Sequence, residues 1–260
     1  MMRRRLLAVA ALFLASAAHA RIDPREFESL SFHQHPGAQL PLDAQLRDET
    51  GRPVVLGEML EHRPAVLVLE YLRCKNLCSL VLSGATAAIS RGGLVPGRDL
   101  ELVAVSIDPR DTVADSASAR AMYARRTPGA KIGGLHFLTG SPQEVRRIAS
   151  AVGFPYRFDS ESAQFAHPAG FVVLTPEGRI SRYILGLGPS ARTLRTAVAE
   201  AARNQITPPA HPLLCLCFGY DPDEGSVAAL AWRLTRIVAS VVALCLLGLL
   251  LLLARRQRTA

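Results

Sequence analysis

Two cysteines one helical turn apart are the residues of this sequence best suited to chemistry. Cys74 and Cys78 follow directly on an apolar run at 65–71, and His167 lies far downstream, immediately before a second apolar run at 170–174. Two thiolates and an imidazole form a three-ligand set for a soft metal, whereas the two thiols alone can close to a reversible disulfide. These residues therefore predict either a metal site or a redox-active cysteine pair.

Copper is one soft metal that suits this ligand set. Thiolates suit Cu(I), and an imidazole serves both Cu(I) and Cu(II). Zinc is the natural competitor for two cysteines and a histidine, but a structural zinc site normally takes four protein ligands, and only three are evident here. Lys75 stands between the two cysteines, and its charge should favour the thiolates that both metal binding and disulfide exchange require.

The remaining cysteines and some of the histidines are weaker candidates. His33 and His35 lie in a polar N-terminal arm, where a solvated loop is favoured over an auxiliary copper site. Cys215 and Cys217 lie in a proline-containing stretch, and they could form a strained disulfide or bind copper transiently. The favoured interpretation of that pair is two small apolar residues, and the same holds for Cys245.

Strand-like and helix-like patterns alternate through the middle of the chain. Buried strands are expected at 65–71, 100–107, 135–138, 170–174 and 179–185, and helices at 76–90, 113–126, 142–152 and 190–204. Residues 48–52 are expected to form a turn between two short strands, and Ser141 to cap the helix that follows it. This order predicts an α/β fold with a mixed central sheet and helices on both faces.

Both ends of the chain are typical of an exported, anchored protein. Residues 1–20 combine an arginine cluster, a short apolar run and a small-x-small cleavage site, as secretory signal peptides do. Residues 237–254 are apolar and uncharged over 18 positions, close to the length of a membrane-spanning helix. The expected organisation is a signal peptide 1–20, an arm 21–41, a domain 42–206, a tether 207–236, a transmembrane helix 237–254 and a cytoplasmic tail 255–260.

The net charge of +8 does not indicate a nucleic-acid partner. Eight of the 30 lysines and arginines lie in the signal peptide or beside the expected span, which leaves 22 to balance the 22 aspartates and glutamates. The exported part is therefore close to neutral, and its charge favours no polyanionic partner.

Three segments of the sequence resemble the Sco/SenC family, whose members are thioredoxin-like, membrane-tethered copper proteins that assist assembly of cytochrome c oxidase. The segments are 71–78, which holds both cysteines, 106–112 with Asp108, Asp111 and Arg110, and 164–170 with His167. A further similarity, at 217–222, points to the bacterial subgroup anchored at its C-terminus. The resemblance implies a thioredoxin-like fold, copper as Cu(I) or Cu(II) bound by Cys74, Cys78 and His167, and a place in the bacterial inner membrane with the domain in the periplasm.

The chain departs from the family pattern near the ligands. Ser79 and Lys75 stand where the family usually has proline, and no aspartate lies at 163–166, directly before His167. All three ligand types are kept. Asp108, Arg110 and Asp111 are expected to order a loop near the site, because carboxylates are hard ligands and suit Cu(I) poorly.

Two functions remain open at the level of the sequence. The favoured one is a copper metallochaperone that delivers copper to the copper-bearing subunit of cytochrome c oxidase, with periplasmic copper carriers or thiol reductants as further partners. The alternative is a thiol–disulfide oxidoreductase that reduces the cysteines of that subunit through a Cys74–Cys78 disulfide. A peroxidase of the same fold is less favoured because it leaves His167 unexplained, and a binding function is favoured over an enzymatic one.

Overall fold

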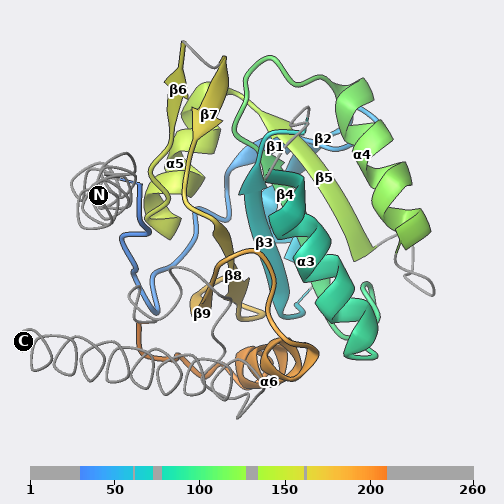
Figure 1. Cartoon of the computed structure of the whole chain (residues 1–260), viewed down its shortest axis with the longest axis vertical. Coiled ribbons are helices and arrows are strands. Elements are labelled where there is room, and N and C mark those ends of the chain that lie inside the picture. Colours follow the sequence, from blue (N-terminus) through green and yellow to red (C-terminus); the bar gives the residue numbers. More distant parts are fainter. Residues whose placement is uncertain (1–29, 61, 73–77, 127–133, 161–162, 210–260) are drawn as a thin grey trace, which may run out of the picture.

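The computed structural model describes residues 30–60, 62–72, 78–126, 134–160 and 163–209. Within these ranges the chain forms one seven-stranded sheet flanked by helices, and a separate two-stranded hairpin (Figure 1). The strands are β1 (Gln45–Arg47), β2 (Pro53–Val55), β3 (Ala65–Glu70), β4 (Glu101–Ser106), β5 (Leu135–Gly140), β6 (Arg157–Asp159), β7 (Gln164–Ala166), β8 (Gly170–Leu174) and β9 (Ile180–Leu185). The helices are η1 (Leu56–Leu60), α3 (Cys78–Arg91), α4 (Val113–Arg126), α5 (Pro142–Val152) and α6 (Ala191–Ala201).

The sheet is mixed, as the sequence predicts. Its strand order is β2-β1-β5-β4-β3-β8-β9, in which β3, β4 and β5 run parallel and the other neighbours pair antiparallel. Parallel neighbours need a crossover, and α3 and α4 follow β3 and β4 in the chain. This arrangement is a thioredoxin-like α/β fold.

Helices cover both faces of the sheet. One core packs α5 and η1 against alternate residues of β3, including Leu67 and Leu69. The other core packs α3, α4 and α6 against the opposite face of the sheet, where the remaining residues of β3, including Val66 and Val68, point. All six residues of β3 are buried, which is why this strand reads as a continuous apolar run rather than an alternating one.

Local signals place the ends of α5. Ser141 accepts a hydrogen bond from the amide of Glu144, which confirms the expected N-cap. Gly153 ends the helix in the left-handed conformation, with φ of 63°. An added Cβ there would lie 1.8 Å from the carbonyl oxygen of His33, so the N-terminal segment approaches too closely for any larger residue.

The structure departs from the sequence prediction at a hairpin and at the end of the last helix, and it shows how the N-terminal arm packs. The β6–β7 hairpin was not expected from the sequence, and α6 ends at Ala201 rather than at 204. The expected arm is packed where it is described, since the amide of His33 donates to the carbonyl of Gly153 and the amide of Gly37 donates to that of Ile180.

The end segments stay predictions. Among the helices within the described ranges, none has the length and apolar character to cross a bilayer. The expected signal peptide and the span at 237–254 lie outside the described residues. The proposed domain boundaries are likewise untested.

Candidate metal and thiol site

Three connections meet at one edge of the sheet. The parallel strands β3 and β4 both end there, β3 leading into Tyr71 and Leu72 and β4 into the segment at 107–112. Strand β8 runs antiparallel to β3, so its start lies at the same edge, directly after His167. The fold therefore gathers the three segments that the sequence singled out.

His167 is half-buried between β7 and β8. Its Nδ1 lies 2.8 Å from the carbonyl oxygen of Pro168. Because a carbonyl can only accept, Nδ1 carries the proton and the lone pair is on Nε2, the nitrogen able to coordinate a metal. Burial lowers the pKa of His167, although the hydrogen bond to Pro168 opposes that shift. A neutral imidazole is the form that a metal ligand requires, and in this tautomer Nε2 is the donor atom.

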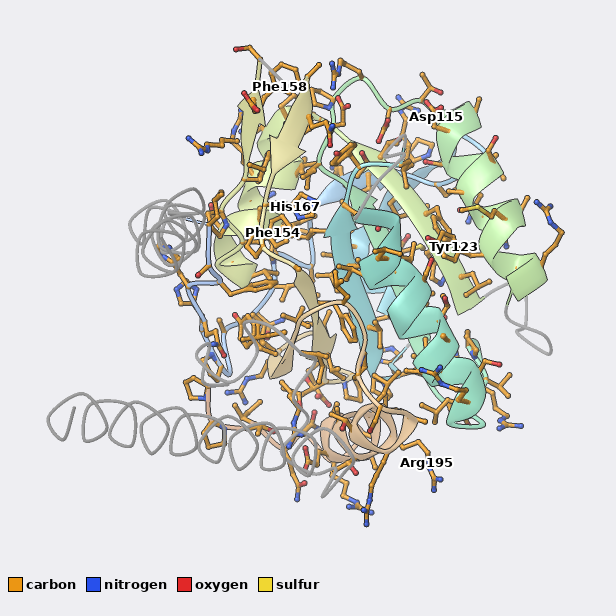
Figure 2. The ribbon with its side chains drawn as sticks, viewed as in Figure 1. Asp115, Tyr123, Phe154, Phe158, His167 and Arg195 are labelled. Atoms are coloured by element: carbon orange, nitrogen blue, oxygen red, sulfur yellow. The ribbon has the colours of Figure 1, made fainter. Side chains whose placement is uncertain are left out.

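Aromatic rings surround the imidazole. Phe154 stacks on it, with ring centroids 5.4 Å apart and planes inclined by 29° (Figure 2). Tyr71 meets it edge-on, at 6.1 Å and 90°. Tyr71 also contacts Phe165 at 5.7 Å, and its hydroxyl donates to Oε1 of Gln164 over 3.3 Å.

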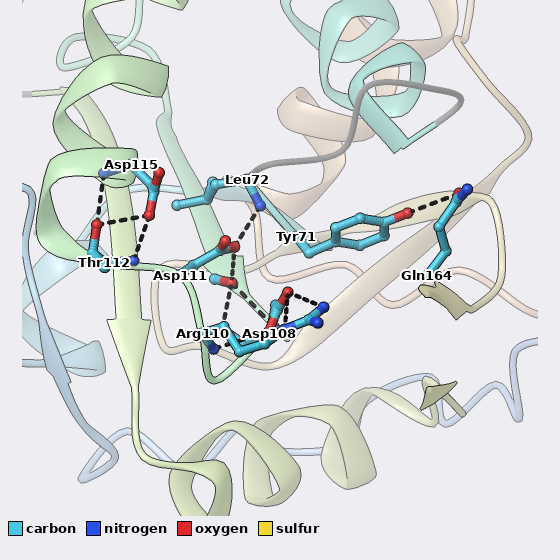
Figure 3. Close-up of polar contacts among 9 residues, drawn as sticks. Tyr71, Leu72, Asp108, Arg110, Asp111, Thr112, Asp115 and Gln164 are labelled. Carbon is cyan, nitrogen blue, oxygen red and sulfur yellow. Dashed lines mark hydrogen bonds and ion pairs between the residues drawn. The ribbon is translucent and has the colours of Figure 1, made fainter. Parts of the chain in front are cut away.

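A buried carboxylate holds the chain directly before the cysteine segment at 73–78. Oδ2 of Asp111 accepts a hydrogen bond of 2.6 Å from the amide of Leu72 (Figure 3). The same oxygen accepts one of 2.7 Å from the hydroxyl of Ser106. Asp111 is 8% exposed. The loop after β4 thus fixes the last described residue before the cysteines.

Asp108 and Arg110 order the same loop and connect it to the hairpin. Arg110 donates to both carboxylate oxygens of Asp108, from Nε to Oδ1 at 2.8 Å and from a terminal nitrogen to Oδ2 at 2.8 Å. The guanidinium carbon of Arg110 lies 4.8 Å from the ring centroid of Phe158 in β6, within cation–π distance. The ordering role expected for Asp108, Arg110 and Asp111 is confirmed.

A cavity of about 340 Å³ lies between this loop, the start of α5 and the hairpin. Its walls include Asp108, Arg146, Tyr156, Phe158 and Phe165. Phe165 lies two residues before His167, so the cavity adjoins the site and does not contain its imidazole among its lining residues.

The two cysteines are only partly covered by the described structure. Cys74 and Lys75 lie outside the described residues, as do Cys215, Cys217 and Cys245. Cys78 is the first residue of α3, and its side chain is not described. Among the described side chains, no group of three or more histidines, cysteines or carboxylates could hold a metal. The three-ligand set therefore remains a prediction, of which the structure describes the histidine.

The aromatic neighbours of His167 were not singled out by sequence reasoning. Tyr71 ends an apolar run, and Phe154 follows α5 at a helix end, so both read as ordinary core residues. Both are indeed buried, at 7% and 3% exposure. Only the folded arrangement places them on the imidazole.

Comparison with known families identifies the class of protein. The SCO1/SenC family model matches residues 37–203. The chain belongs to the SCO1/SenC family. The expected Sco/SenC membership is therefore confirmed, whereas the C-terminally anchored subgroup is not shown.

Several solved structures share the fold of this chain. A candidate electron transfer protein from Aquifex aeolicus VF5 is 25% identical, with a TM-score of 0.58, over 66% of this chain and 96% of that one. A SCO1/SenC family lipoprotein from Bacillus anthracis str. Ames is 14% identical, with a TM-score of 0.52, over 64% and 97%. BsSco, described as a member of the Sco family of cytochrome c oxidase assembly proteins with a disulfide switch, is 16% identical, with a TM-score of 0.50, over 65% and 97%. In the comparison with curated proteins, none matches this chain.

Proposed function

We propose that this protein is a copper metallochaperone that serves the copper centre of cytochrome c oxidase. Membership of the SCO1/SenC family supports a role in oxidase assembly. The observation that carries the copper function is His167, whose Nδ1–H is committed to the carbonyl of Pro168 so that Nε2 bears the lone pair. This imidazole lies at the edge of the sheet from which β3 leads toward Cys74 and Cys78.

Copper is the cargo of this site rather than a resident cofactor. Two thiolates of Cys74 and Cys78 and the Nε2 of His167 would hold Cu(I) without a change in oxidation state. Each thiol must lose its proton on binding, so affinity falls as the pH falls. Lys75 lies between the two cysteines in the sequence, and its positive charge favours the thiolate forms that copper binding requires.

The same thiolates support a second candidate function. A thiol–disulfide oxidoreductase would pass two electrons from the Cys74–Cys78 dithiol to a target disulfide, so that the target becomes a dithiol and this pair becomes the disulfide. Lys75, between the two cysteines in the sequence, is the specific observation in its favour, since a nearby positive charge assists thiolate attack as well as metal binding. His167 has no part in that exchange, so it discriminates the two functions.

Titration with Cu(I) against a competing chelator tests the proposal. The reduced protein should bind one copper, and His167→Ala should weaken binding by roughly tenfold or more while the fold is kept. His33→Ala is the matched control, because it removes an exposed imidazole of the N-terminal arm. Equal affinity in His167→Ala and in the wild type would contradict the three-ligand site, and weakening by His33→Ala alone would move the site to the arm.

The location of the protein is part of the proposal. Residues 1–20 and 237–254 support export and a C-terminal anchor, with the folded domain in the periplasm and residues 255–260 in the cytoplasm. Anchoring would confine the search for the oxidase subunit to the membrane surface.

A further inference from the structure

Two aromatic rings from separate parts of the chain hold the imidazole of His167. Phe154 stacks on it, and Tyr71 lies perpendicular to it. We propose that Tyr71 and Phe154 are positioning residues, which fix the plane of the imidazole and thereby the direction of the Nε2 lone pair. This inference rests on the proposed copper function, because it concerns how the ligand is presented.

Packing has to fix the plane, because the covalent geometry does not. The second side-chain torsion of a histidine is broad, so an isolated imidazole rotates readily. A single hydrogen bond from Nδ1 to Pro168 limits this rotation without selecting one plane. A ring stacked on the imidazole and a second ring perpendicular to it together leave one orientation favoured.

Phe154 is itself held rigidly. Gly153 turns the chain at the end of α5, and the amide of Phe154 then donates to the carbonyl of Ala149 over 2.8 Å. Its ring also packs against Phe32, at 5.4 Å with the planes inclined by 67°. The end of α5 therefore fixes the position of the ring that stacks on His167.

Tyr71 connects the histidine to the cysteine segment. Its ring contacts His167 and Phe165, and its hydroxyl reaches Gln164, so it touches two residues of β7 and one residue of the loop before β8. Its main chain continues to Leu72, whose amide Asp111 holds at 2.6 Å. A displacement of Tyr71 would thus change both the orientation of the His167 imidazole and the path of the main chain at Leu72, directly before the cysteine segment.

The experiment uses the full chain with matched ring deletions on the two faces of the sheet. Tyr71→Leu and Phe154→Leu each remove one ring from the imidazole, and Tyr71→Phe keeps the ring. Tyr123→Leu is the control, because Tyr123 stacks on Phe137 at 5.6 Å in the core on the opposite face. The first readout is the tautomer and the rotational mobility of the His167 imidazole, measured by nitrogen NMR in the metal-free protein. The second is Cu(I) affinity against a competing chelator.

We expect Tyr71→Leu and Phe154→Leu to make the imidazole more mobile and to lower Cu(I) affinity by roughly tenfold. Tyr71→Phe should stay close to the wild type, and Tyr123→Leu should lose thermal stability without changing either readout. Should Tyr71→Leu not fold, Phe154→Leu decides the question alone. Imidazole mobility and affinity in Phe154→Leu that match those of Tyr123→Leu would overturn the proposal. A wild-type protein that binds no Cu(I) would instead overturn the copper function, and the metal-free spectra would still decide the positioning role.

Discussion

At the scale of single residues, the site depends on groups whose own positions are fixed by hydrogen bonds. His167 is oriented by a carbonyl, and Leu72 by a carboxylate that also accepts from Ser106. A buried carboxylate that accepts two hydrogen bonds is costly to remove, because each donor loses its partner. Substituting the groups that make these hydrogen bonds should therefore change the stability of the fold or the order of the chain around the candidate site.

Asp111→Ala should destabilise the fold and loosen the chain before the cysteines. It leaves the amide of Leu72 and the hydroxyl of Ser106 without this acceptor, at a cost of roughly 1–3 kcal/mol for each buried group. Chemical denaturation measures the loss of stability, and hydrogen exchange at the Leu72 amide measures the local opening. Asp115→Ala is the control, since Asp115 accepts from Thr112 in the same loop, and it should leave exchange at Leu72 unchanged. Protection of that amide unaltered by Asp111→Ala would show that the contact does not hold the chain.

At the scale of the elements, the sequence predicts the central strands well and the hairpin poorly. The runs at 65–71 and 100–107 are apolar throughout because both faces of β3 and β4 are covered, so they stand out from their surroundings. Strand β6 has all three residues exposed, and β7 has only half-buried ones, so neither carries an apolar pattern. The hairpin is held instead by the pairing of β6 with β7 and by the cation–π contact of Arg110 with Phe158. Arg110 is distant from Phe158 in the sequence, so no local pattern predicts their contact.

The candidate site divides in the same way. Cys74, Cys78 and His167 could be singled out because their chemistry is unusual, and Asp111 because it lies in a recognisable segment. Tyr71 and Phe154 could not, because an aromatic residue at the end of a strand or helix is most often part of the core. Their role depends on the antiparallel approach of β8 to β3, which is a property of the folded sheet.

The turn between β1 and β2 provides a pH-dependent contribution to stability. Oδ1 of Asp48 accepts from the amide and the hydroxyl of Thr50, at 2.9 and 2.6 Å, and the amide of Arg52 donates to the same oxygen. Although burial opposes the shift, the hydrogen bonds from Thr50 and Arg52 lower the pKa of Asp48. The folded state therefore binds a proton less readily than the unfolded state. This stabilisation is complete above the ordinary pKa of about 3.9 and is lost as the pH falls through the lowered value.

Asp48→Asn should accordingly destabilise the protein at neutral pH, by roughly 1–2 kcal/mol. The difference from the wild type should shrink as the pH falls below about 3.9. Urea denaturation at a series of pH values measures both effects. Asp159→Asn serves as a control, because Asp159 lies in the exposed strand β6. A difference between Asp48→Asn and the wild type that stays constant with pH would contradict the assigned ionic contribution.

At the scale of the whole molecule, we expect the folded domain to be brought to its target by a membrane anchor. The folded part carries the histidine, and the sequence of residues 1–20 and 237–254 is the basis for the expected export and attachment. If the anchored topology is correct, the mature protein should begin after Ala20, and protease added to spheroplasts should degrade the domain. A mature N-terminus at Met1 would contradict cleavage, and protection of the domain would contradict the topology.

Physiology separates the two candidate functions. Loss of a copper chaperone should lower cytochrome c oxidase activity most when copper is scarce, and added copper should partly restore it by mass action. Loss of a thiol reductase should instead be rescued by a small exported reductant and not by copper. Oxidase activity in a deletion strain, with and without each addition, measures this. Rescue by reductant alone, and equally by a His167→Ala copy, would favour the reductase.

The central claim is that Cys74, Cys78 and His167 hold one copper together. X-ray absorption spectroscopy of the Cu(I)-loaded protein tests it most directly, because it counts the sulfur and nitrogen donors on the metal. The account predicts two sulfur donors and one nitrogen donor, with the nitrogen lost in His167→Ala and the copper released when the two cysteines are oxidised to a disulfide. A coordination sphere without nitrogen, or one that is the same in the wild type and in His167→Ala, would contradict it.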